Sequence, residues 1–353
     1  MKVRPTRFRL VSTLTFLAAL LAVPLATEAA DTRAKFLDLI RRPAVPLAAD
    51  VSAPTPAENG VVRIAFSFAS DAQQRVPGIL TKSTSRSGKR PVVIALHGTG
   101  GNKESQLSLL TQLAQEGFIG VAIDGRYHGA RTQAGKGTDE YNAALLRAFD
   151  APAGQPHEHP FFFDTVWDVI RLIDYLATRD DVDATRIGLI GFSKGGIEAY
   201  LAAAADPRIA VVVPCIGVQS FRWALEHDTW RSRVETVQTA FDTAAKHSGV
   251  TTLDAAFVHT FYDHVAPGLD GEFDGPAMLP LIAPRPLLSI NGGTDARTPL
   301  PGLNECADAA RRAYHAAGAD DKFVLLVQPN TGHKVTDESM KTAHAWLIRW
   351  LKP

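Results

Sequence analysis

Three residues of the types that carry out acyl transfer occur along this chain in the order serine, aspartate, histidine. The serine, Ser193, lies within Gly191-Phe192-Ser193-Lys194-Gly195, between an apolar run that predicts a strand and an Ala-rich run that predicts a helix. A serine on such a turn needs small neighbours two residues away on each side, because side chains there would strike the backbone or block the substrate. Both positions are glycine, so the sequence predicts that Ser193 is a nucleophile. An ordinary serine capping a glycine-rich turn is the alternative for this motif taken alone.

The other two residues follow predicted strands. Asp295 comes after the apolar run Pro286 to Ile290, and His333 comes after the apolar run Phe323 to Val327. A serine hydroxyl is a weak nucleophile at neutral pH, so an imidazole must take its proton and return it to the leaving group, while a carboxylate orients that imidazole. We expect His333 to be the general base and Asp295 its acid partner. Considered singly, Asp295 could cap a turn and His333 could be an ordinary loop histidine.

Backbone N–H groups must stabilise the oxyanion that forms during attack. The apolar run Pro91 to Leu96 predicts a buried strand, and the glycines of His97-Gly98-Thr99-Gly100-Gly101 let the backbone after it approach a substrate closely. We expect the N–H groups of Thr99 and Lys194 to be the donors, each of which typically contributes about 3 kcal/mol. His97 is expected to brace this loop. The Lys194 side chain is expected to point off its helix, although an ammonium near the site would favour an acidic substrate.

Three segments together carry a family resemblance: His97 to Gly101, Asp124 to Gly129, and Gly191 to Gly196. They resemble the α/β-hydrolase superfamily, in the branch that holds dienelactone hydrolases, acetyl xylan esterases and prolyl oligopeptidases, over about Val61 to Trp350. The resemblance implies an α/β fold with a mostly parallel eight-stranded sheet, helices on both faces, and the three candidate residues at its carboxyl edge. A serine nucleophile in place of cysteine separates the chain from true dienelactone hydrolases.

Composition and residue spacing argue against several other classes of protein. With 353 residues, 46% hydrophobic and 21% charged, the chain can bury one large core. Its 37 basic and 37 acidic residues argue against a nucleic-acid partner. Cys215 and Cys306 have no metal-binding spacing; an exported protein could pair them, but two separate buried thiols are expected. His157-Glu158-His159 lacks the further ligands of a zinc site, so we expect a solvated loop and no metal.

The N-terminal segment has the order of a secretory signal peptide. Met1 to Arg9 is basic, Leu10 to Val23 is apolar, and small residues follow. We expect residues 1–29 to be removed and the protein to be periplasmic or extracellular; an uncleaved anchor is the alternative, but the apolar run is shorter than the ~20 residues that span a bilayer. Residues 30–59 predict an extended lead-in with one short helix near Arg33 to Ile40, and residues 60–353 the hydrolase domain.

A long insertion, about residues 216–283, separates two predicted strands and predicts a helical cap over the site. Its aromatic residues are expected to form the cap's own small core more than a substrate wall. They are Phe221, Trp223, Trp230, Phe241, Phe257, Phe261, Tyr262 and Phe273.

These patterns predict an exported serine hydrolase that cleaves a small-molecule carboxylic ester through an acyl-enzyme, with no cofactor and no metal. A serine peptidase of the prolyl-oligopeptidase type would use the same three residues, but the chain carries no propeller domain to filter peptides. A catalytically silent hydrolase fold that acts as a binding protein is the alternative from another class. The sequence does not predict the acyl group, the alcohol group or the oligomeric state.

Overall fold

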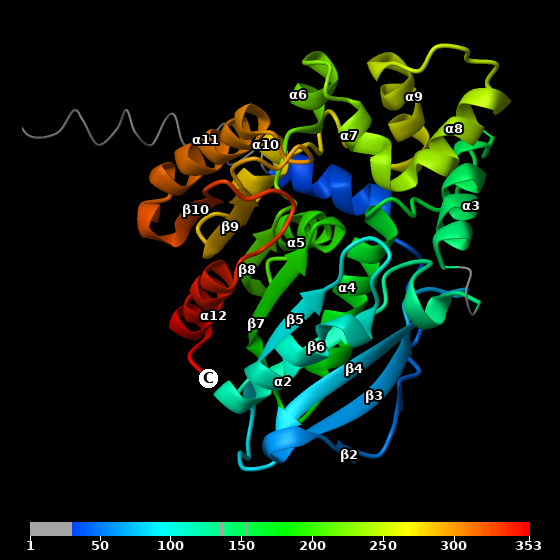
Figure 1. The fold of residues 1–353 in the computed structure, drawn as a ribbon. Coiled ribbons are helices and arrows are strands. Elements are labelled where there is room, and N and C mark those ends of the chain that lie inside the picture. Colours follow the sequence, from blue (N-terminus) through cyan, green and yellow to red (C-terminus); the bar gives the residue numbers. More distant parts are fainter. Residues whose placement is uncertain (1–29, 134–136, 153) are drawn as a thin grey trace, which may run out of the picture.

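A computed structural model describes residues 30–133, 137–152 and 154–353 (Figure 1). The predicted signal peptide, residues 1–29, lies outside the described residues. Among the helices that are described, none is long and apolar enough to cross a membrane. The predicted lead-in contains a helix over residues 30–40, where the sequence predicts a short one.

A single mixed sheet of ten strands runs through the described part of the chain, in the order β1-β3-β4-β6-β5-β7-β8-β9-β10, with β2 paired to β3. The strands are β1 (Asp50–Val51), β2 (Thr55–Pro56), β3 (Val61–Ala69), β4 (Arg75–Ser83), β5 (Arg90–Leu96), β6 (Ile119–Ile123), β7 (Val182–Phe192), β8 (Ile209–Cys215), β9 (Leu287–Gly292) and β10 (Phe323–Gln328). The strands from β6 to β10 in this order pair in parallel, whereas β1 to β4 pair antiparallel with their neighbours. The two strands beyond the expected eight, β1 and β2, are two residues long and add to the edge at β3.

The parallel strands form because they are buried on both faces. Every residue of β5, β6 and β9 is buried, and most of these residues are apolar, with no regular alternation of buried and exposed positions. Parallel neighbours need crossover connections, which the helices provide. The carboxyl ends of these strands therefore meet at one edge of the sheet.

Helices cover both faces of the sheet, as expected. The helices are α2 (Leu107–Glu116), α3 (Gly137–Phe149), α4 (Phe163–Ala177), α5 (Lys194–Ala205), α6 (Phe221–Glu226), α7 (Arg231–Val234), α8 (Gln238–His247), α9 (Ala255–Val265), α10 (Gly275–Met278), α11 (Leu300–Ala316) and α12 (Asp337–Leu351). Helices α4, α5 and α11 share one apolar cluster with the helix over residues 30–40, and α2 and α12 share the cluster on the opposite face.

The insertion between β8 and β9 folds as the short helices α6 to α10, and α3, which lies between β6 and α4 in the chain, contacts α8 and α9. Figure 1 shows α6 to α9 and α3 grouped beyond the carboxyl ends of the parallel strands. Most of the insertion's aromatic side chains are buried in the large apolar cluster with their neighbours, for example Trp230, Phe241 and Phe261. They form the core that such a short-helix layer needs in order to fold.

A buried ionic network holds the loop after β6 against the sheet. The guanidinium of Arg126, 1% exposed, donates to both carboxylate oxygens of Asp168 and to Asp71. Burial alone would lower the pKa of Arg126, but these carboxylates raise it above its ordinary value. Asp124 accepts hydrogen bonds from the backbone and the ammonium of Lys103, at 2.8 and 2.7 Å. These contacts position the backbone beside the loop after β5.

Candidate active site

Ser193 lies on a strained turn between β7 and α5. Its backbone has φ 53° and ψ −115°, a left-handed conformation that a side-chain-bearing residue rarely adopts. The flanking glycines are required by packing: a Cβ on Gly191 would lie 2.0 Å from the carbonyl oxygen of Gly195, and one on Gly195 would lie 2.4 Å from that of Leu96. The turn therefore has the geometry of a nucleophile elbow, as the spacing predicts.

The structure brings the three sequence-predicted residues together at the carboxyl edge of the sheet. The Ser193 hydroxyl lies 2.8 Å from Nε2 of His333, and Nδ1 of the same ring lies 2.7 Å from Oδ2 of Asp295. Ser193 follows β7, Asp295 follows β9 and His333 follows β10, so residues 140 positions apart become neighbours. The arrangement lets the imidazole accept the hydroxyl proton on one side while the carboxylate holds its other N–H.

Asp295 is held as an anion in a nearly closed environment. Its side chain accepts from the backbone N–H of Arg297 at 2.9 Å and from the hydroxyl of Thr298 at 3.0 Å, besides the bond from His333. Burial acts to raise the pKa of Asp295, but these hydrogen bonds outweigh it and hold the pKa below its ordinary value. An ionised partner at this position favours the imidazolium that forms when His333 takes a proton.

The loop after β5 lies against the nucleophile. A Cβ on Gly98 would lie 3.5 Å from the Cβ of Ser193, and Thr99 lines the same pocket as Ser193 and Lys194. Lys194 is the first residue of α5, whose first N–H groups have no partner within the helix. The two backbone donors expected for an oxyanion therefore both belong to this pocket.

His97 braces that loop. Its Nε2 accepts from the backbone N–H of Gly125 at 3.0 Å, so Nδ1 carries the proton and donates to the carbonyl of Gly98 at 2.8 Å. Burial, assisted by the ammonium of Lys194, lowers the pKa of His97 to about 4. A neutral ring with both nitrogens occupied has no free group for proton transfer, as the sequence interpretation expects.

The expectation for the Lys194 side chain is wrong. It does not point off the helix; it is buried, as is Glu198 one turn later, each with 2% of the side chain exposed, and the two form an ion pair. Burial raises the pKa of Glu198, although Lys194 and a hydrogen bond from Thr165 oppose that shift. The sequence feature that could have indicated this ion pair is the i, i+4 spacing of Lys194 and Glu198, but such spacing of opposite charges is ordinarily found on exposed helix faces.

The pocket at Ser193 has an aromatic wall formed by the residues just before α4 and by the insertion between β8 and β9. Its open space, including the mouth, is about 420 Å³, and its lining includes Phe161, Phe162 and Phe221. Phe161 and Phe162 precede α4 and were not singled out by sequence reasoning. Trp223 and Trp230 do not line it; Trp230 faces another hollow and packs 6.3 Å from the ring of Phe241.

The expectation of a solvated loop at residues 157–159 also needs correction. His159 is buried, and burial lowers the pKa of its imidazole to about 4. Glu158 is half-buried and accepts hydrogen bonds from Tyr127 and Arg126. The segment is a packed connection that continues the ionic network behind the site. The two cysteines are free and buried, which confirms the expectation of separate thiols.

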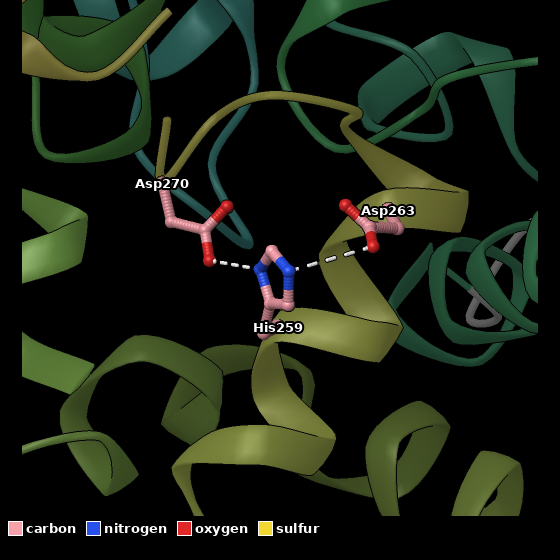
Figure 2. A group of neighbouring side chains, drawn as sticks. All are labelled: His259, Asp263 and Asp270. Atoms are coloured by element: carbon pink, nitrogen blue, oxygen red, sulfur yellow. Dashed lines mark hydrogen bonds and ion pairs between the residues drawn. The ribbon is translucent and has the colours of Figure 1, made fainter. Parts of the chain in front are cut away.

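A second group of titratable side chains lies away from the pocket, on α9 and the loop that follows it (Figure 2). Nδ1 of His259 lies 2.6 Å from Oδ2 of Asp270, and Nε2 of the same ring lies 3.7 Å from Oδ2 of Asp263. The carboxylates face opposite edges of one imidazole, and a single metal ion cannot bind both nitrogens of that ring. The arrangement fits a doubly paired imidazolium better than a metal centre, and the hydrogen bond to Asp270, together with the charges of Asp270 and Asp263, raises the pKa of His259.

Comparisons with known proteins agree with this fold. A family model described as glucuronyl esterase, fungi, matches residues 153–318. A putative hydrolase, YtaP, of Bacillus subtilis (strain 168) is 28% identical over 296 residues, which cover 80% of this chain and 85% of that protein. A 4-O-methyl-glucuronoyl methylesterase of Wolfiporia cocos is 30% identical over 173 residues. That match covers 48% of this chain and 40% of the fungal protein, so the chain spans less than half of its length.

Solved structures extend the likeness to nearly the whole chain. Acetyl xylan esterase 1 from Thermoanaerobacterium sp. JW/SL YS485 has a TM-score of 0.66 at 19% identity and covers 92% of this chain and 93% of its own. A glucuronoyl esterase from Solibacter usitatus has a TM-score of 0.61 at 17% identity, with 89% and 91% covered. These structural likenesses show that the chain has an α/β-hydrolase fold, as these acetyl xylan and glucuronoyl esterases do.

Proposed function

We propose that the chain hydrolyses a carboxylic ester through an acyl-enzyme formed on Ser193. His333 takes the hydroxyl proton as Oγ attacks the ester carbonyl, and it then gives that proton to the departing alcohol. Asp295 keeps the imidazole in the tautomer that accepts at Nε2 and stabilises its charged form. The N–H groups of Thr99 and Lys194 stabilise the oxyanion. Water, activated by the same imidazole, then releases the acid.

The observation that carries the proposal is the unbroken pair of hydrogen bonds from the Ser193 hydroxyl through His333 to Asp295, at 2.8 and 2.7 Å. It is supported by the strained turn at Ser193, because a strained backbone persists only where the surroundings enforce it. The relatives named as esterases support the choice of an ester over a peptide bond. None of these steps uses a cofactor.

The experiment is hydrolysis by the purified protein of 4-nitrophenyl esters, acetylated sugars, uronic acid methyl esters and aminoacyl anilides, with labelling by a fluorophosphonate. Ser193→Ala should lower kcat by about 10⁶-fold, to background, and abolish labelling. Ser85→Ala, at an exposed serine between β4 and β5, is the matched control. Ester turnover within tenfold of wild type in Ser193→Ala would refute the proposal. Turnover of the anilides above the esters would favour the peptidase alternative.

We also propose that the protein is exported. The basic, apolar and small-residue order of residues 1–29 supports export, with cleavage near Ala29. Mass spectrometry of protein recovered from the periplasm or medium should give an N-terminus near residue 30. Intact Met1 on protein confined to the cytoplasm would contradict this.

A further inference from the structure

The insertion between β8 and β9 contributes to the pocket wall a buried arginine that the proposed mechanism does not use. Arg233, in α7, is 4% exposed and lines the pocket together with Ser193 and His333. Its backbone is held in place because the Tyr262 hydroxyl donates to its carbonyl oxygen at 2.8 Å. The guanidinium lies 5.5 Å from the ring centroid of Phe221, which limits where it can move. The charge is therefore fixed at the pocket.

Among the described residues, the hydrogen-bond partners of this guanidinium are all neutral. Its Nε donates to the hydroxyl of Ser232 at 3.2 Å, and Nη2 donates to the backbone carbonyl of Arg297. An arginine has five N–H donors, and within the described residues no carboxylate lies within ion-pair distance of this one. Arg126, equally buried, differs in that it contacts three carboxylates.

The other two cations of the pocket are neutralised. Lys194 pairs with Glu198, and Arg297 pairs with Glu235 at 2.9 Å. A buried charge without a counter-ion is costly, so an arginine held in this state needs a compensating anion. Within the part of the chain that the structure describes, the carboxylates of Asp274 and Asp295 attract this guanidinium only from beyond ion-pair distance, and the pocket wall itself carries no anion beside it.

A second, independent polar group in the same wall lacks a partner. Gln219 is 5% exposed and lines the pocket, and its Oε1 is buried without a hydrogen-bond partner among the described residues. Buried amide oxygens are normally paired. Gln219 and Arg233 therefore both present unused hydrogen-bonding capacity to the pocket that contains the nucleophile.

We propose that Arg233 is a specificity-determining residue that binds a carboxylate of the substrate, so that the preferred substrate is an ester carrying a free acid group. The inference rests on the proposed function and names the substrate class for the same site. A carboxylate matches the planar fork of a guanidinium and forms charge-assisted hydrogen bonds with it. Gln219 would bind a neighbouring polar group of the substrate.

The test compares esters that differ in charge and little in shape. The first pair, mono-4-nitrophenyl glutarate and the neutral 4-nitrophenyl valerate, places the free acid on the acyl side of the ester. The second pair, 3-acetoxybenzoate and the neutral 3-acetoxybenzamide, places it on the alcohol side. The wild type should prefer the acid of at least one pair by about ten- to a hundredfold in kcat/KM, the range of a charged hydrogen bond. Arg233→Met should remove that preference mainly through KM, and Arg233→Lys should restore part of it.

Arg231→Met is the matched control, because Arg231 is an exposed arginine of the same helix and stacks on Trp230 outside this pocket. It should leave the acid-to-neutral ratio unchanged. A wild type that prefers the neutral esters on both sides would overturn the proposal. Equal losses of kcat/KM on acid and neutral esters in Arg233→Met would also overturn it. That result is expected if Arg233 has only a structural role, as the hydrogen-bond donor to the Arg297 carbonyl.

A binding measurement separates this proposal from the proposed function. Calorimetric titration of the Ser193→Ala variant with monomethyl glutarate needs no turnover, and binding should be lost or weakened at least tenfold when Arg233→Met is added. Binding that is absent or unaffected by Arg233→Met would overturn the subsite even if neutral esters are hydrolysed. If no ester is turned over but binding depends on Arg233, the proposed function fails and the subsite stands.

Discussion

The ion pair between Lys194 and Glu198 offers a quantitative test of how the nucleophile helix is stabilised. Both side chains are 2% exposed, so removing one partner leaves a charge that water cannot solvate. Breaking a buried pair in this way costs about 3–5 kcal/mol, whereas replacing both partners with apolar groups is often nearly neutral. We expect Glu198→Ala to destabilise the fold by that amount and Lys194→Met/Glu198→Leu to recover most of it.

The assay is reversible urea denaturation of the mature protein, supported by thermal melting. For a chain of this size about 2–4 °C accompany each kcal/mol, so Glu198→Ala should lower Tm by roughly 6–20 °C. Asp308→Ala is the control, because Asp308 and Arg311 form a pair with 58% and 54% of their side chains exposed, for which about 0.5 kcal/mol or less is expected. A loss below about 1 kcal/mol in Glu198→Ala, or a double variant no better than the single one, would refute this reasoning.

Four further substitutions test the site and its surroundings. His333→Ala should lower kcat for 4-nitrophenyl acetate by about 10⁶-fold and Asp295→Asn by about 10⁴-fold, with unchanged melting; a silent Asp295→Asn would show that another carboxylate is the acid. Gly191→Ala should yield little soluble protein in an expression and solubility assay, since its Cβ would lie 2.0 Å from the Gly195 carbonyl oxygen, and a folded, active variant would contradict that contact. His259 has a raised pKa in the folded state, so its contribution to stability is present below its unfolded pKa and is lost as pH rises through the folded value. The difference in urea midpoint between wild type and His259→Gln should therefore be larger near about pH 5.5 than near about pH 9, and a difference independent of pH would exclude the ion pairs as its cause.

The predicted positions of the three candidate residues agree with the structure because each depends on local sequence. A buried strand followed by a glycine-flanked serine and a helix has few alternative conformations, as the contacts of Gly191 and Gly195 show. Asp295 and His333 could be assigned because parallel strands bring their carboxyl ends to one edge, whatever their separation in the chain.

The sequence by itself determined the α/β architecture, the elbow at Ser193 and the order of its candidate partners, since strand patterns and steric limits act over a few residues. Only the tertiary structure decided that Lys194 turns inward to Glu198, that Phe161 and Phe162 line the pocket, and that Arg233 lies there with no carboxylate of the described residues within ion-pair distance. These features depend on which insertions pack beside one another beyond the sheet. Whether a charge is buried and paired depends on such long-range neighbours, and the local sequence does not indicate which residues they are.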